Sequence, residues 1–179
     1  MIKKNAAQVG SSVIRARSQT VSLPISTANK KIIADLIDSM RHHELVGMAA
    51  PQLGKSVRIF VTEIRKTRLR KGDSVKNSDP LRIFLNPKII SVSKKTTMGW
   101  EGCGSVATSN LFGMVKRPAT VTVEAVNENG KLFQLMAHDL LARVIQHEMD
   151  HLNGIVFTDK ADSKTYMSRG EYLKLRSKT

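Results

Sequence analysis

The stretch VIQHEMDHLNG, residues 144–154, constrains this chain most, because it joins an apolar helical pattern to the spacing H-E-x-x-H. On a helix, His147 and His151 project from one face about one turn apart, with Glu148 beside them. Apolar residues lie on more than one face of this helix, so it is expected to be buried. Burial of two imidazoles and a carboxylate costs several kcal/mol unless they are paired or bind a metal. The stretch therefore predicts a metal site on a buried helix.

Two imidazoles hold a metal poorly, and two residues are candidates for a third ligand. Cys103, the only cysteine, lies in WEGCGSV between two glycines, which suit a backbone that closely approaches another group. Glu171 follows His151 at a distance seen in thermolysin-like proteases, but it stands in a segment rich in lysine and arginine. We favour Cys103, because a thiolate with two imidazoles leaves a fourth position open for water, which is the catalytic pattern.

Alternating and β-branched segments predict short, locally paired strands. The clearest is TVTVEAV, followed by the turn NENG and a return strand that would complete a hairpin. Asn86-Pro87 is expected to separate two strands, and the charged residues 63–80 to form a long insertion or hairpin. The expected strands are 56–62, 81–85, 88–92, 120–126, 131–136 and 155–157.

Helices are expected at 27–43 and 171–178, on either side of the central helix at 140–152. Asp139 is the candidate N-cap of the central helix, and Asn153-Gly154 its stop. Locally paired strands around one central helix are typical of an α+β fold. We expect antiparallel sheets packed around the helix that carries H-E-x-x-H, with an N-terminal helix and a short C-terminal helix.

The length and net charge of the chain limit which domain organisation and which partners are expected. A chain of 179 residues suggests one catalytic domain over 1–179, with basic arms at about 1–14 and 168–179. The net charge of +14 fits a solvated basic surface or a large anionic partner such as the ribosome. No nucleic-acid motif with interleaved aromatics is present, so sequence-specific nucleic-acid binding is not expected. No apolar run approaches the roughly 20 residues of a membrane span, so no membrane partner is expected.

The N-terminal composition bears on the compartment. The first 34 residues contain no aspartate or glutamate, which faintly resembles a mitochondrial transit peptide. We favour a basic N-terminal arm of the mature domain, because helical patterning and the first motif follow almost at once. The expected location is the bacterial cytoplasm, with the mitochondrion or another organelle as the alternative.

Three motifs together resemble the peptide deformylase family. LVGMAAPQ at 45–52 matches the family's G-x-G-(apolar)-A-A-P-Q except at its first position. EGCGS at 101–105 matches E-G-C-L-S except at its fourth position, and QHEMDHL at 146–152 matches Q-H-E-x-D-H-L throughout. Motif order and spacing also match, and the likeness covers roughly residues 15–170.

The resemblance implies a hydrolase that removes the N-formyl group from the N-terminal methionine of newly made polypeptides. Its implied metal ligands are Cys103, His147 and His151. They would bind one divalent metal ion, commonly Fe²⁺ in the bacterial enzymes, with Zn²⁺, Ni²⁺ or Co²⁺ as alternatives. Metal-bound hydroxide would attack the formyl carbon, with Glu148 as general acid and base. The Gln52 amide and the backbone N–H of Gly104 would hold the oxyanion.

The substrate-binding residues follow from the same resemblance and contain the main departures from it. Gly47 would let the substrate backbone run close, beside Val46 and Leu45, and Glu101 would steady the cysteine loop. Gly104 replaces a leucine that lines the methionine pocket in the family. Leu45 replaces a glycine, and would narrow the substrate approach or fill the space vacated at 104.

Two other functions are kept open. One is a peptidase that uses Glu171 as the third ligand. The other is a deformylase-like metal protein with altered or lost substrate specificity, whose basic surface binds the ribosome or another anionic partner. In the leading interpretation, formyl-methionyl nascent peptides are the substrates.

Overall fold

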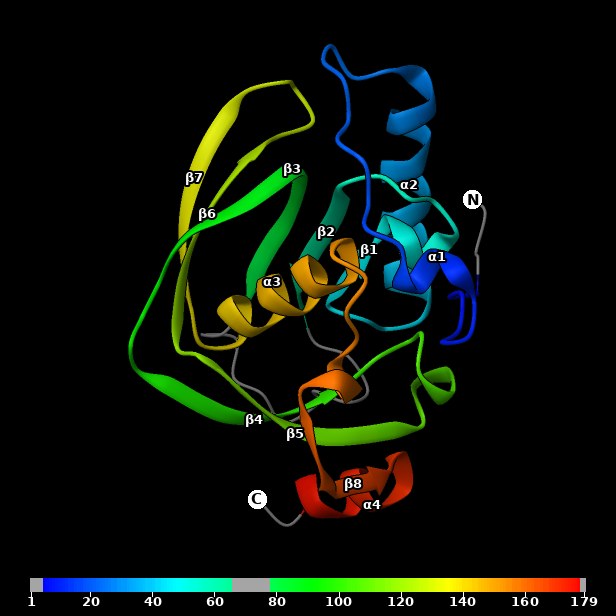
Figure 1. The fold of residues 1–179 in the computed structure, drawn as a ribbon, viewed down its shortest axis with the longest axis vertical. Coiled ribbons are helices and arrows are strands. Elements are labelled where there is room, and N and C mark those ends of the chain that lie inside the picture. The colour runs from blue at the N-terminus through cyan, green and yellow to red at the C-terminus, as the bar shows by residue number, and fades with distance from the viewer. Residues whose placement is uncertain (1–4, 66–77, 178–179) are drawn as a thin grey trace.

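The central element of the fold is α3 (Asp139–Leu152), which packs between two antiparallel sheets (Figure 1). The computed structural model describes residues 5–65 and 78–177. The larger sheet has the strand order β1-β2-β3-β6-β7, and the smaller sheet has the order β4-β5-β8. The predicted α+β class with antiparallel sheets is confirmed.

The strands match the predicted segments best where side chains alternate. β6 (Thr120–Val126) has the predicted bounds, and β7 (Leu132–His138) pairs with it as the predicted hairpin. The other strands of the larger sheet are β1 (Gly47–Ala49), β2 (Ile59–Ile64) and β3 (Asp79–Val92). The strands of the smaller sheet are β4 (Thr96–Gly102), β5 (Leu111–Pro118) and β8 (Ala161–Ser168).

One long strand, β3, replaces the two strands predicted on either side of Asn86-Pro87. Asn86 has a φ of 50°, and the pairing with β6 shifts register between Leu85 and Lys88. The Asn86 side chain accepts from the Val21 N–H at 2.7 Å and donates to the Val21 carbonyl at 2.8 Å. The expected break is therefore a bulge that the side chain of Asn86 stabilises.

One further prediction of local structure was wrong. Residues 155–157 do not form a strand, because the chain turns into η5 (Phe157–Asp159), where Asp159 Oδ2 accepts from the Val156 N–H at 3.0 Å. The first of the three motifs forms β1 followed by η1 (Ala50–Leu53). Of the predicted insertion at 63–80, residues 66–77 lie outside the described residues.

The remaining helices are α1 (Ser12–Arg15), α2 (Thr27–His42) and α4 (Arg169–Arg176). The N-cap position of α3 is His138, whose side chain makes no capping hydrogen bond, so the prediction of Asp139 as N-cap was wrong. β7 runs directly into the helix, and its last extended residue takes the N-cap position. At the other end, Asn153 is the C-cap and Gly154 has a φ of 75°, as the predicted stop requires.

The segments expected as basic arms pack against the rest of the chain through apolar anchors. Ile14 of α1 is fully buried. Tyr172 of α4 is buried and stacks on Phe112 of β5, with ring centroids 4.1 Å apart. In the described residues, no helix has an apolar stretch of the length that a bilayer requires.

The main core lies between α3 and the inner face of the larger sheet, where it fixes the helix that carries the candidate ligands. Its members are apolar and buried almost completely, so the helix has little freedom to shift. They include Ala49, Phe60, Phe84, Val121, Val123, Ile145 and Leu152.

Candidate metal centre and adjoining pocket

Three candidate metal ligands come together beside a pocket, and two of them, Cys103 and His147, line it. The ligand atoms of Cys103, His147 and His151 all lie within 4.8 Å of one another. α3 supplies both histidines, and the turn after β4 supplies the cysteine. Cys103 Sγ lies 3.2 Å from His151 Nε2. One thiol and two imidazoles form a donor set that suits Fe²⁺, Zn²⁺ and similar divalent ions.

The alternative ligand, Glu171, is not part of this group. It lies on α4 with its side chain 61% exposed, and its Oε1 is 2.7 Å from Lys174 Nζ. Within residues 5–65 and 78–177, the cysteine-histidine group is the one set of three such side chains whose ligand atoms gather closely enough for a metal. The fold therefore assembles the ligand set that was favoured from the sequence.

The charges in the metal-free cluster favour a thiolate at Cys103 and a protonated ring at His147. The thiolate is the metal-binding form of cysteine, whereas a metal ion would displace the proton from His147. Burial raises the pKa of the Cys103 thiol, but the neighbouring His151 and His147 outweigh burial and hold that pKa well below its ordinary value. Burial lowers the pKa of His147, but hydrogen bonds with Cys103 and Glu101 raise it well above the ordinary value. A thiolate is thus stabilised at the position where a metal ligand is needed.

Glu148 faces the first motif. A Cβ built on Gly47 would lie 2.5 Å from Glu148 Oε1, so position 47 has no room for a side chain. Glu148 Oε2 is buried without a hydrogen-bond partner in the described part of the chain. Burial raises the pKa of Glu148 to about 7. A carboxyl group in this range can accept and return a proton near neutral pH.

Glu101 joins His147 to a buried network of ion pairs. Glu101 Oε2 lies 3.0 Å from His147 Nδ1, and both carboxylate oxygens accept from Arg117, at 2.6 and 2.8 Å. Arg143 Nη1 donates to Glu101 Oε1 at 2.7 Å. Burial raises the pKa of Glu101, but Arg117 and His147 lower it well below its ordinary value. An ionised Glu101 therefore fixes the orientation of the His147 ring.

Sequence reasoning missed three charged members of this network: Arg117, Arg143 and Asp150. Arg117 is only 2% exposed and connects Glu101 to Asp150, whose Oδ2 accepts from Arg117 Nη1 at 2.8 Å. Each of the three stands in an apolar strand or helix, and a charged residue at a core position requires a partner. That signal was available in the sequence, but the identity of the partners depends on how the sheets meet α3.

Gln52 lies beside the cysteine on the η1 side of the pocket. Its Nε2 donates to Ser105 Oγ at 3.4 Å and to Cys103 Sγ at 3.6 Å, and its Oε1 accepts from the Ala49 N–H at 2.8 Å. The side chain is 2% exposed, so these contacts fix its rotamer. The amide therefore presents a donor near the three candidate ligands.

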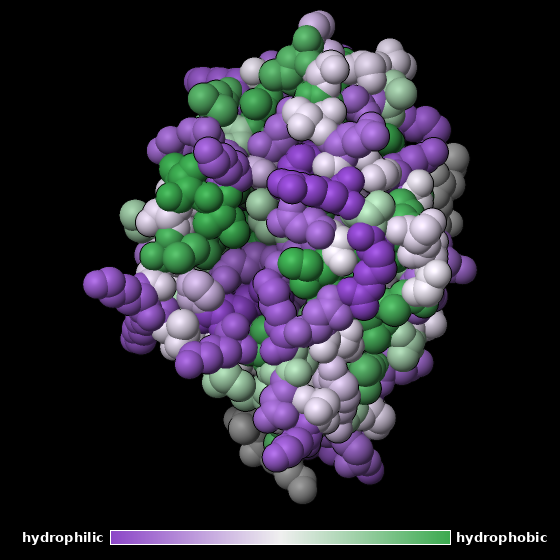
Figure 2. Space-filling model, viewed as in Figure 1, coloured by the Kyte–Doolittle hydropathy of each residue, from purple (hydrophilic) through white to green (hydrophobic). Residues whose placement is uncertain are grey.

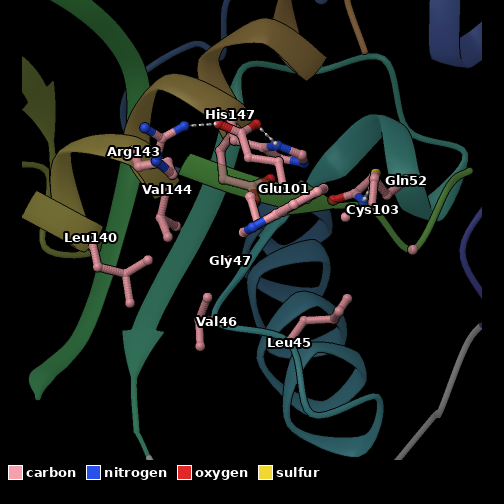
Figure 3. A pocket seen from close by; sticks show the side chains of 14 residues that line it. Leu45, Val46, Gly47, Gln52, Glu101, Cys103, Leu140, Arg143, Val144 and His147 are labelled. Carbon is pink, nitrogen blue, oxygen red and sulfur yellow. Dashed lines mark hydrogen bonds and ion pairs between the residues drawn. The ribbon is translucent and has the colours of Figure 1, made fainter. Parts of the chain in front are cut away.

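An apolar pocket of about 150 Å³ opens beside these groups (Figure 3). Leu45, Val46, Leu140 and Val144 line it together with His147. A second cavity of about 490 Å³ shares several of these walls and extends along β4 toward α4. The metal centre thus adjoins space for an apolar side chain and for a longer ligand.

Leu45 and Gly104 face each other beside the pocket. A Cβ built on Gly104 would lie 3.4 Å from Leu45 Cδ1. The backbone at Gly104 does not have a positive φ, so its conformation does not itself demand glycine. The contact supports the expectation that Leu45 fills space which a side chain at 104 would otherwise enter.

Comparison with known sequences agrees with the motifs. The family model for polypeptide deformylase matches residues 3–166. The peptide deformylase of Treponema pallidum (strain Nichols) is 38% identical over 148 residues, which are 81% of this chain and 82% of that protein. The peptide deformylase of Microchaete diplosiphon is 35% identical over 161 residues, 90% of this chain and 80% of that protein.

Solved structures agree with the fold. The actinonin-bound class I type b peptide deformylase from Acinetobacter baumannii aligns with a TM-score of 0.79 at 26% identity, covering 90% of this chain and 100% of that one. The peptide deformylase from Thermotoga maritima gives 0.76 at 30% identity, covering 90% and 99%. Sequence motifs, architecture and the cysteine-histidine group agree, and the chain belongs to the polypeptide deformylase family.

Proposed function

We propose that the chain removes the N-formyl group from the N-terminal methionine of new polypeptides, using Cys103, His147 and His151 to hold one divalent metal ion. The observation that carries the proposal is the gathering of these three side chains beside Glu148 and an apolar pocket. Fe²⁺ is the proposed native ion, and the donor set also accepts Zn²⁺, Ni²⁺ or Co²⁺. When bound, such an ion lowers the pKa of water and polarises the formyl oxygen.

Glu148 is the proposed general acid and base. Its carboxylate takes the proton of the attacking water, the C–N bond of the formamide breaks, and the carboxyl returns the proton to the departing amine. The products are formate and a free α-amino group. The unpartnered Oε2 and the raised pKa of Glu148 support this role, since the group can change protonation near neutral pH.

Gln52 and Gly104 are the proposed donors to the oxyanion. The buried Gln52 amide is held by hydrogen bonds, so it loses little freedom when the charge develops. The backbone N–H of Gly104 would be the second donor. Glu101 contributes indirectly, because its contact with His147 Nδ1 fixes the orientation of the imidazole ring.

The substrate main chain is proposed to run between two sheet edges. β1 is the edge of the larger sheet, and β4 is the edge of the smaller one. Residues beside both edges, among them Leu45, Val46 and Trp100, line the two adjoining cavities. A short peptide could add to such edges as a strand, with Gly47 allowing its close approach. A structure of the Acinetobacter baumannii relative is described as bound to Met-Ala-Ser, which supports a peptide of this kind.

The proposed setting is the bacterial cytoplasm, near the ribosome. Bacterial relatives support the compartment. Hydrophilic side chains cover much of the face seen in Figure 2, and the net charge is +14. A chain with this net positive charge is expected to attract ribosomal RNA in a salt-dependent way. Cosedimentation with ribosomes at low salt, lost as salt is raised, is the expected result.

Metal analysis of two variants tests the assignment of ligands. Cys103→Ser is expected to lose metal and turnover of formyl-Met-Ala-Ser, whereas Glu171→Ala retains both, because Glu171 is exposed and outside the cluster. The reverse result would favour the peptidase. A metal-loaded wild type that never releases formate would favour the non-catalytic metal protein.

A further inference from the structure

The N-terminal strap, residues 5–9, spans both segments that surround Cys103. The Ala7 N–H donates to the Gln52 carbonyl at 2.8 Å, and the Val9 N–H donates to the Ser105 carbonyl at 2.8 Å. One short segment thus joins η1 to the turn that follows the cysteine. Immediately after the strap, α1 is anchored by the fully buried side chain of Ile14.

The carboxamide of Gln8 clamps that turn at two points. Its Nε2 donates to the Gly104 carbonyl at 2.8 Å and to the Ala6 carbonyl at 2.9 Å. Its Oε1 accepts from the Thr108 N–H at 3.0 Å. Both ends of the carboxamide are used, and they hold backbone groups on either side of residues 105–107.

The turn needs such a clamp because much of its backbone is disfavoured. Ala107, Thr108 and Ser109 have φ values of 47°, 51° and 65°, in the left-handed region that L-residues rarely adopt. Such a conformation persists only where surrounding contacts determine it. Gly104 offers no side chain as an anchor, so the Gln8 bonds to the backbone supply the restraint.

The clamped peptide unit is also the one that contacts the sulfur of the candidate ligand. Gln8 holds the carbonyl of the Gly104–Ser105 peptide, and the N–H of the same peptide donates to Cys103 Sγ at 3.3 Å. The strap also bonds the backbone of Gln52, whose amide lies 3.6 Å from that sulfur. Orientation of the sulfur and of both proposed oxyanion donors therefore depends on the strap.

We propose that Gln8 is a positioning residue for deformylation, which sets the geometry of the Cys103–Gly104 turn from outside the pocket. The predicted effect of Gln8 on the rate of deformylation rests on the proposed function. Its effect on the turn itself is independent of the reaction. The fold contains a matched control in Gln134, an exposed glutamine on β7 whose Nε2 bonds Glu124 at 2.9 Å.

The test uses Gln8→Met, which keeps the length of the side chain and removes its hydrogen bonds, with Gln134→Met as control. Hydrogen exchange is measured on the full-length protein at the amides of residues 103–109, and kcat and KM are measured with formyl-Met-Ala-Ser. Gln8→Met is expected to speed exchange in this turn and to lower kcat about 10- to 100-fold, the usual effect of losing a group that orients a metal ligand. KM and the melting temperature should change little, and the control should change nothing.

A second variant separates the two bonds. Gln8→Glu keeps an acceptor for the Thr108 N–H but loses the donor to the Gly104 carbonyl. It should protect the amide of Thr108 while leaving kcat low, because the peptide beside the sulfur is released.

Three outcomes would overturn the proposal. They are unchanged exchange in Gln8→Met, unchanged kcat despite faster exchange, and a loss of kcat that merely follows a fall in melting temperature. If the metal-loaded wild type has no turnover, the proposed function fails. The positioning of the turn is then upheld or overturned by the exchange data alone.

Discussion

Exchanging the side chains of Leu45 and Gly104 tests how the substrate pocket is built. Leu45→Gly removes an aliphatic wall of the pocket. A missing apolar contact of this kind costs about 1–3 kcal/mol of binding, which corresponds to roughly a 5- to 150-fold rise in KM for formyl-methionyl peptides. The catalytic constant should change less, because Leu45 is an apolar wall of the pocket and is not among the three candidate ligands.

Gly104→Leu alone should harm the protein in a different way. Its Cβ would start 3.4 Å from Leu45 Cδ1, and the rest of the leucine side chain needs further room. Overpacking of a filled site typically costs about 1–3 kcal/mol of unfolding free energy. The backbone at 104 accepts the substitution, so the loss should come from crowding of the leucine side chain against Leu45 and against Ala6, whose Cβ lies 3.5 Å from the same position.

The double variant, Leu45→Gly with Gly104→Leu, should recover much of both losses, because the new leucine enters the space that Leu45 leaves. For each variant, initial rates of formate release measured without oxygen give the change in the free energy of substrate binding. Urea denaturation gives the change in the free energy of unfolding. The free-energy changes caused by substitutions at independent sites add to within about 0.3–0.5 kcal/mol. Additivity within that range would refute the idea that the two positions share one space.

Three other predictions concern stability. Arg117→Met leaves the carboxylates of Glu101 and Asp150 buried with fewer partners, and urea denaturation should show a loss of about 3–5 kcal/mol; a loss under about 1 kcal/mol would contradict a buried pair. In the metal-free protein, the folded-state pKa of Glu148 is about 7, above its ordinary value of 4.5. The contribution of Glu148 to the free energy of unfolding is therefore fully present below pH 4.5 and falls by about 3 kcal/mol as pH rises to 7. Glu148→Gln should lack this pH-dependent contribution. An identical pH profile of unfolding in the variant and the wild type would contradict the raised pKa. Tyr172→Ala should cost about 3 kcal/mol and speed proteolysis within α4, since it removes the stack on Phe112; unchanged proteolysis would mean that α4 is held by other contacts.

Local pattern was sufficient to predict the elements that depend on neighbouring residues. β6 has its predicted bounds because its side chains alternate between a buried and a half-buried face. α3 ends where Asn153-Gly154 predicted, since Gly154 takes the left-handed conformation that terminates a helix. By contrast, the bulge in β3 depends on hydrogen bonds between Asn86 and the distant Val21, which no local pattern reveals.

The residues of the candidate site also fall into those that local sequence predicts and those that depend on tertiary packing. Cys103, His147 and His151 could be predicted because their residue types and spacing carry chemical meaning. The ion pairs that hold them could not, since Arg117 on β5 meets Asp150 on α3 only after the two elements pack. Gln8 is the extreme case, because its contacts with the cysteine turn join residues almost a hundred positions apart.

Turnover of formyl-Met-Ala-Ser by the metal-loaded protein, measured without oxygen and with metal analysis alongside, tests the central claim most directly. Oxygen is excluded because a thiolate ligand can be oxidised, which would make a negative result ambiguous. The expected result is one metal ion per chain and steady release of formate, with Glu148→Gln about 10²–10⁴ slower at unchanged metal content. Absence of formate from the metal-loaded wild type, or equal rates in the two proteins, would contradict it.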